Sequence, residues 1–112
     1  MGSTKTNLFT PAQNSLAQIC KALAHPARIA ILEHLLQTTT CVNNELVAEL
    51  GLAQATVSQH LKELKALDII QGSVEGARIC YCINPKKWSE ISQTLNHMFN
   101  GPKSIDTTIN CC

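Results

Sequence analysis

The stretch from residue 45 to residue 66 constrains the fold more than any other part of the sequence. It contains two short runs with apolar residues at helical spacing: Leu46, Val47 and Leu50, then Val57, Leu61 and Leu64. Only Gly51, Leu52 and Ala53 separate the two runs, and glycine is a common residue at the end of a helix. Two short helices joined by three or four residues that include glycine are typical of a helix-turn-helix.

A β-hairpin is predicted directly after the second of these helices. Residues 69–74 and 77–83 have strand composition, and Glu75-Gly76 between them suits a tight turn. In the second strand, Arg78, Cys80 and Cys82 alternate with the apolar residues and therefore share one face. A hairpin attached to a helix-turn-helix is a wing. The predicted fold is therefore mostly α with a small β wing, a winged helix-turn-helix.

Three further helices complete the predicted set of five. The first covers residues 11–24, with Leu16, Ile19 and Leu23 inward. The second starts at Pro26 and has a broad apolar face made of Ile29, Leu32 and Leu36, with Ile31 and Leu35 beside them. Residues 38–42 then predict a brief strand, and Asn43 or Asn44 caps the next helix. The last helix begins at Asn84-Pro85 and carries Trp88, Ile91, Leu95, Met98 and Phe99 along one side.

With 112 residues, 45% of them apolar, the chain has room for one packed domain. We expect a flexible N-terminal tail over residues 1–10, the folded domain over residues 11–100, and a flexible C-terminal tail with a Cys pair over residues 101–112. Neither a secretory leader nor a membrane-length apolar run is visible, so a cytoplasmic protein without membrane contact is expected.

The outward face of residues 54–66 is suited to a DNA major groove. If the leucine side is buried, Ala55, Gln59 and Lys62 lie at the centre of the outer face. Glutamine can pair with an adenine edge, hydroxyls reach phosphates or bases, and lysine adds charge. Because the net charge is only +1, DNA binding requires such a local patch, although an ordinary solvated helix face has a similar composition. The candidate DNA contacts are Gln54, Ala55, Thr56, Ser58, Gln59, His60, Lys62 and, on the wing, Arg78.

The sequence resembles the ArsR/SmtB family of bacterial winged-helix repressors. The likeness is carried by residues 21–32 (KALAHPARIAIL), residues 45–64 (ELVAELGLAQATVSQHLKEL) and the Tyr81-Cys82-Ile83 end of the wing. The resemblance implies a homodimer built from the first and last helices. It also implies repression without inducer, and release of DNA when an ion or a thiol-reactive species binds. Two recognition helices in a dimer predict double-stranded DNA with an inverted-repeat operator.

Six cysteines in a chain without a leader indicate thiol chemistry more than a disulfide framework. Cys80 and Cys82 lie on one face of the wing strand, and a strand over residues 38–42 paired with it brings Cys41 beside them. Three thiolates suit As(III) or Sb(III), with Zn or Cu(I) as other candidates. The second choice of ligands is Cys111 and Cys112. Cys20 is expected in the core or at a dimer interface, and the four histidines are expected to be structural or solvated.

Two other interpretations stay open. The same fold can sense oxidants or reactive sulfur through a disulfide or polysulfide bridge between two cysteines. A winged helix can also bind protein instead of DNA. An enzyme is not expected, because no cysteine has a nearby histidine by spacing and no glycine-rich phosphate loop is present.

Overall fold

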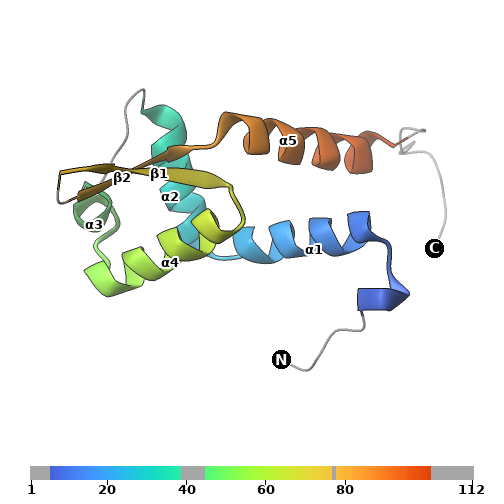
Figure 1. Ribbon diagram of the computed structural model, residues 1–112, viewed down its shortest axis with the longest axis horizontal. Helices are drawn as coiled ribbons and strands as arrows, with labels where there is room; N and C mark the ends of the chain where they lie inside the picture. The colour runs from blue at the N-terminus through green and yellow to red at the C-terminus, as the bar shows by residue number, and fades with distance from the viewer. Residues whose placement is uncertain (1–5, 39–44, 77, 102–112) are drawn as a thin grey trace, which may run out of the picture.

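The computed structural model describes residues 6–38, 45–76 and 78–101. Within them, a short 3-10 helix precedes five α-helices and one β-hairpin (Figure 1). Their bounds are η1 Thr6–Leu8, α1 Pro11–Leu23, α2 Pro26–Gln37, α3 Glu45–Leu50, α4 Gln54–Ala66, β1 Ile70–Glu75, β2 Arg78–Ile83 and α5 Pro85–Asn100. The predicted winged helix-turn-helix is confirmed, with α3 and α4 as its two helices and the hairpin as its wing.

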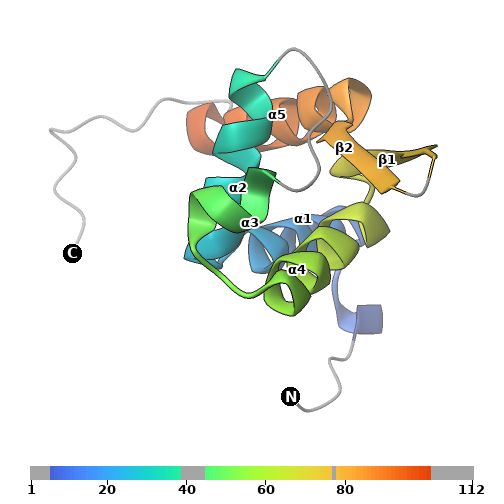
Figure 2. The ribbon, with the colours of Figure 1, turned by 90° about the vertical axis from the view of Figure 1, so that its left-hand side faces the viewer.

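The helix-turn-helix and the wing occupy one end of the molecule, and α1 and α5 extend together from the other. Figure 1 shows α1 and α5 reaching toward the same side, away from the hairpin. Turned by 90°, the hairpin, α3 and α4 face the viewer (Figure 2). The helix-turn-helix with its wing and the free ends of α1 and α5 therefore lie at opposite ends of the molecule.

The core lies where α2, α3, α4 and the hairpin meet. Its largest fully buried side chains are Ile31 of α2, Leu46 of α3, Leu64 of α4, and Ile69 and Ile70 at the start of the wing. The predicted inner side of α4 is confirmed, since Val57, Leu61 and Leu64 are all buried. Burial of one side only leaves the opposite side of α4 in solvent.

The predicted apolar face of α2 is partly wrong. Ile31, Leu32 and Leu35 are buried, whereas Ile29 and Leu36 are 41% and 49% exposed. When a helix has apolar residues on most of its sides, its own sequence does not show which side is buried. The neighbouring elements decide: α2 contacts α1, α3, α4 and β2, and the residues that it buries are Ile31, Leu32 and Leu35.

Cys20 is another correction, because it is exposed and does not belong to the core of the chain. Ile19 and Ala22 form the buried side of α1. Cys20 is the residue after Ile19, so it lies about 100° around the helix from it. The place of Cys20 at a dimer interface stays a prediction.

The wing is an antiparallel pair in which Ile70 lies opposite Ile83 and Glu75 opposite Arg78. Gly76 makes the turn with a φ of 64°, a left-handed conformation that glycine adopts without strain. In this register Gln71 pairs with Cys82 and Ser73 with Cys80, so the two cysteines share a face as predicted.

Near the N-terminus the structure is more regular than the sequence suggested. The 3-10 helix η1 lies within the expected tail, and Thr10 caps α1 through a reciprocal pair of hydrogen bonds with Gln13. The predicted strand over residues 38–42 and the caps Asn43 and Asn44 fall outside the described residues, apart from Thr38, which follows α2 in an extended conformation.

Candidate nucleic-acid interface

The outer face of α4 presents small and polar side chains to solvent. Six of the predicted DNA contacts are exposed there: Gln54, Ala55, Thr56, Ser58, Gln59 and Lys62. Ala53 is the N-cap residue of α4, and its side chain provides no cap for the first-turn amides. Amides at a helix N-terminus attract phosphate oxygens, and small residues allow a phosphate to approach. The face therefore has the size and chemistry that a major groove accepts.

Gln59 is held in place by its own helix. Its side-chain Nε2 donates a hydrogen bond to Oε1 of Glu63, at 2.9 Å. This bond uses one of the two N–H donors of the Gln59 side chain. The amide oxygen of Gln59 takes no part in it. Reading an adenine edge requires one donor and one acceptor, and Gln59 keeps its second N–H and its amide oxygen outside this bond.

His60 is the predicted DNA contact that the structure places elsewhere. It is half-buried, and its Nδ1 accepts a hydrogen bond of 3.0 Å from Nε of Arg28, at the start of α2. Burial lowers the pKa of His60, and the positive charge of Arg28 and the nearby His25 lower it further, while Glu63 opposes them. His60 thus faces the neighbouring helix and not the outer face of α4.

Sequence reasoning did not detect this cluster. The rings of His25 and His60 lie 5.8 Å apart, although the two residues are far apart in the sequence. The sequence alone predicts four structural or solvated histidines. The local signal near His25 is a helix that starts with proline and carries a half-buried arginine, and it does not reveal a partner on another helix.

The wing contact predicted for Arg78 stays a prediction. The backbone of Arg78 pairs with Glu75 next to the turn glycine, as expected, but its side chain lies outside the described part of the structure.

The predicted thiol site is only partly within the described residues. Cys80 is 5% exposed, and Cys82 is half-buried with its sulfur 3.8 Å from Nε2 of Gln71. Cys41, Cys111 and Cys112 lie outside the described residues. Where the structure describes the chain, no three His, Cys, Asp or Glu side chains gather closely enough to hold a metal ion. Cys80 and Cys82 alone therefore do not complete a trigonal site.

The far end of the molecule carries unpartnered apolar side chains. Met98 and Phe99, at the end of α5, are 64% and 69% exposed. A pocket of about 340 Å³ lies between α1 and α5, lined by Leu23, Trp88, Ile91, Ser92, Leu95, Asn96 and Phe99. In the described part of the chain, no helix combines the length and the hydropathy needed to cross a membrane.

Residues 25–71 match the model of a protein family described as "Bacterial regulatory protein, arsR family". The match begins at the start of α2, covers α3 and α4, and ends in β1. It contains the outer face of α4 in full.

Two proteins of Mycobacterium tuberculosis are similar in sequence. The transcriptional repressor SmtB is 41% identical over 68 residues, which is 61% of this chain and 50% of SmtB, so the chain matches only about half of that relative. The transcriptional regulator CmtR is 30% identical over 99 residues, or 88% of this chain and 80% of CmtR.

Solved structures agree with these relatives. The solution structure of CmtR, described as a cadmium metal-sensor, superimposes with a TM-score of 0.53 at 31% identity, covering 87% of this chain and 96% of CmtR. The crystal structure of Rv0081, also from M. tuberculosis, gives a TM-score of 0.65 at 28% identity, covering 80% and 90% of the two chains.

The sequence relatives are named as regulators of transcription, in agreement with the prediction that this chain is not an enzyme. With a helix-turn-helix, a wing and a relative matched over most of its length, the chain belongs to the arsR family of bacterial regulatory proteins.

Proposed function

We propose that this chain is a transcriptional repressor that binds double-stranded DNA, with α4 in the major groove. The observation that carries the proposal is the division of α4 into two sides. Val57, Leu61 and Leu64 are buried, and the small polar residues from Gln54 to Lys62 face outward beside an antiparallel hairpin. Side chains of this kind contact base edges and phosphates in helix-turn-helix complexes.

The repressor acts as a homodimer in this proposal, with α1 and α5 as the interface. The exposed Phe99 and Met98 and the apolar pocket between α1 and α5 support it. Contiguous apolar surface of this kind is typical of association sites. A twofold dimer presents two copies of α4 and reads an inverted repeat with half-sites about one helical turn apart.

Selection from a pool of random duplexes tests the proposal without knowledge of the operator. The purified protein is expected to enrich an inverted repeat, and anisotropy with that duplex should show a dimer bound. A variant with Gln59→Ala and Lys62→Ala should lose the preference for the enriched duplex. Enrichment of no sequence, or an enriched sequence that this variant binds as well as the wild type, would contradict the proposal.

The inducer is proposed to be a soft metalloid, As(III) or Sb(III), held by Cys80 and Cys82 together with Cys41. Two facts support it: Cys80 and Cys82 project from the same face of β2, and β2 packs against α2 near the helix-turn-helix. The relative described as a cadmium sensor supports metal or metalloid sensing in general. Binding there would displace the wing relative to α4, and about 1–3 kcal/mol of coupling lowers DNA affinity about 5- to 150-fold.

Release of the enriched duplex by arsenite, measured on cysteine variants, shows which thiols bind the inducer. Cys80→Ser and Cys82→Ser are expected to abolish release, while the exposed Cys20 provides a matched control as Cys20→Ser. Release that survives in both wing variants and disappears with Cys111→Ser and Cys112→Ser would move the site to the C-terminal pair. Release by peroxide or polysulfide and not by arsenite would replace the metalloid with a thiol oxidant.

A further inference from the structure

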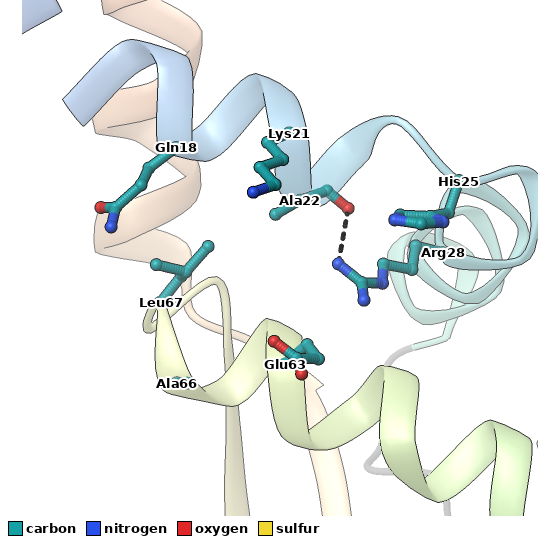
Figure 3. A pocket seen from close by; sticks show the side chains of 8 residues that line it. All are labelled: Gln18, Lys21, Ala22, His25, Arg28, Glu63, Ala66 and Leu67. Atoms are coloured by element: carbon teal, nitrogen blue, oxygen red, sulfur yellow. Dashed lines mark hydrogen bonds between the residues drawn. The ribbon is translucent and has the colours of Figure 1, made fainter. Parts of the chain in front are cut away.

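Arg28 joins three helices at one point. Its backbone belongs to the first turn of α2, its Nε donates to Nδ1 of His60 on α4, and its Nη1 donates to the carbonyl oxygen of Ala22 near the end of α1, at 3.3 Å. Figure 3 shows the guanidinium reaching across the gap between α1 and α4, with the bond to Ala22 dashed. A cation at a helix C-terminus satisfies carbonyls that the helix leaves unpaired.

The surroundings of this arginine form a polar pocket of about 340 Å³, lined by Gln18, Lys21, Ala22, His25, Arg28, Glu63, Ala66 and Leu67 (Figure 3). The groups that act electrostatically on His60 are Arg28 and His25 from the start of α2 and Glu63 from α4 itself, and Lys21 of α1 lines the same pocket. The guanidinium of Arg28 and the carboxylate of Glu63 therefore act on the His60 imidazole in opposite directions.

The hydrogen bond requires His60 to be neutral. Arginine stays protonated and can only donate, so Nδ1 of His60 must carry no proton and Nε2 must carry it. A proton added to Nδ1 would set two donors against each other and place an imidazolium beside a guanidinium. The bond that connects α4 to α1 and α2 would then be lost.

We propose that Arg28 is a positioning residue for DNA binding, which holds α4 at a set angle to α1 through neutral His60, so that protonation of His60 weakens DNA binding. The inference rests on the proposed function. Because α1 belongs to the proposed dimer interface and α4 reads DNA, their mutual angle sets the distance between the two recognition helices of a dimer. An inverted repeat with fixed half-site spacing tolerates little change in that distance.

The expected pH dependence has an unusual sign. Acidification adds positive charge to histidines, which by itself strengthens binding to the phosphate backbone. The Arg28–His60 pair acts in the opposite direction, because the pKa of His60 is lowered in the folded chain and its protonation breaks the pair. Between about pH 8 and about pH 5.5, we expect the dissociation constant of the enriched duplex to rise about fivefold or more at constant ionic strength.

The test compares the wild type with His60→Asn, in which an amide oxygen lies roughly where Nδ1 was and accepts the same hydrogen bond without titrating. His60→Asn should bind as well as the wild type near pH 8 and should not weaken in acid. His34→Asn, on the same helix as Arg28, is the matched control and should keep the wild-type pH profile. Nuclear magnetic resonance of the imidazole gives the His60 pKa and tautomer independently of DNA.

Arg28→Met removes the donor, and Lys21→Met removes one positive charge from the same pocket. Arg28→Met should weaken binding near pH 8 by about fivefold more than Lys21→Met and should raise the His60 pKa. If the wild type binds the enriched duplex but does not weaken in acid, or if His60→Asn weakens equally, the positioning role is wrong and the repressor proposal stands. If the protein enriches no duplex at all, both proposals fail.

Discussion

Helices α4 and α5 are both amphipathic, but in the described part of the chain α4 buries its apolar side and α5 buries only part of its own. Val57, Leu61 and Leu64 are buried on α4. On the longer α5 the structure buries Ile91, while Phe99 and Met98 stay largely in solvent. The comparison shows that α4 is completed by its own fold and offers only its polar side to a ligand. Helix α5 is left with apolar surface that a second chain can cover.

The largest effect is expected in the interior of α4. Leu64→Ala removes a fully buried side chain and should lower the free energy of unfolding by about 2–5 kcal/mol. Leu95→Ala, half-buried on α5, should cost less at low protein concentration and more as the concentration rises, because the proposed dimer would bury it. Chemical denaturation at several concentrations measures both. A concentration-independent cost for Leu95→Ala would contradict the difference between the two helices.

The next effect concerns association. Phe99→Glu places a charge on the exposed end of α5 and should raise the dimer dissociation constant about 30-fold or more, as loss of an aromatic anchor worth about 2 kcal/mol implies. Sedimentation equilibrium measures the change. Gln93→Glu adds the same charge to an exposed position on another side of α5 and should leave the dimer intact. Equal dissociation by both variants would show that α5 does not form the interface with its apolar side.

Smaller effects are expected on the outer side of α4. Gln59→Ala should cost about 1–3 kcal/mol of binding free energy on the enriched duplex and little on random DNA. Lys62→Ala should weaken binding to both and reduce the salt dependence by about one ion. Anisotropy titrations at several salt concentrations separate the two. If Gln59→Ala weakened binding equally on every sequence, Gln59 would not read a base.

The smallest effect is expected from Glu63, which accepts the hydrogen bond from Gln59. Glu63→Gln removes a negative charge near the proposed DNA surface and should strengthen binding about two- to threefold, because an exposed charge contributes at most about 1 kcal/mol. The affinity for random DNA provides the measurement. Weaker binding by this variant would mean that the carboxylate is needed to orient Gln59.

Periodicity within single segments was sufficient to predict much of the fold. The inner residues of α4 and the shared face of Cys80 and Cys82 follow from local repeats of 3.6 and two residues, and the turn follows from the glycine at position 76. The same reasoning placed five polar residues and Ala55 on the outer face of α4, where the structure exposes them. Patterns of this kind are readable because one side of each element is clearly apolar.

Where a helix has no clear side, the sequence was not sufficient. Ile29 and Leu36 of α2 were expected inward and are 41% and 49% exposed. Apolar residues lie on most sides of this helix. Which of them are buried depends on where the neighbouring helices pack, and the chain's local pattern does not contain that information.

The sequence by itself determined a helix-turn-helix with a wing, because the spacing of apolar residues and glycines acts within a few turns of chain. Only the tertiary structure decided that His60 turns away from the outer face of α4 toward Arg28, 32 positions earlier. A hydrogen bond between helices depends on their relative orientation, which results from packing of the whole core. The sequence names both partners of that bond without indicating that they meet.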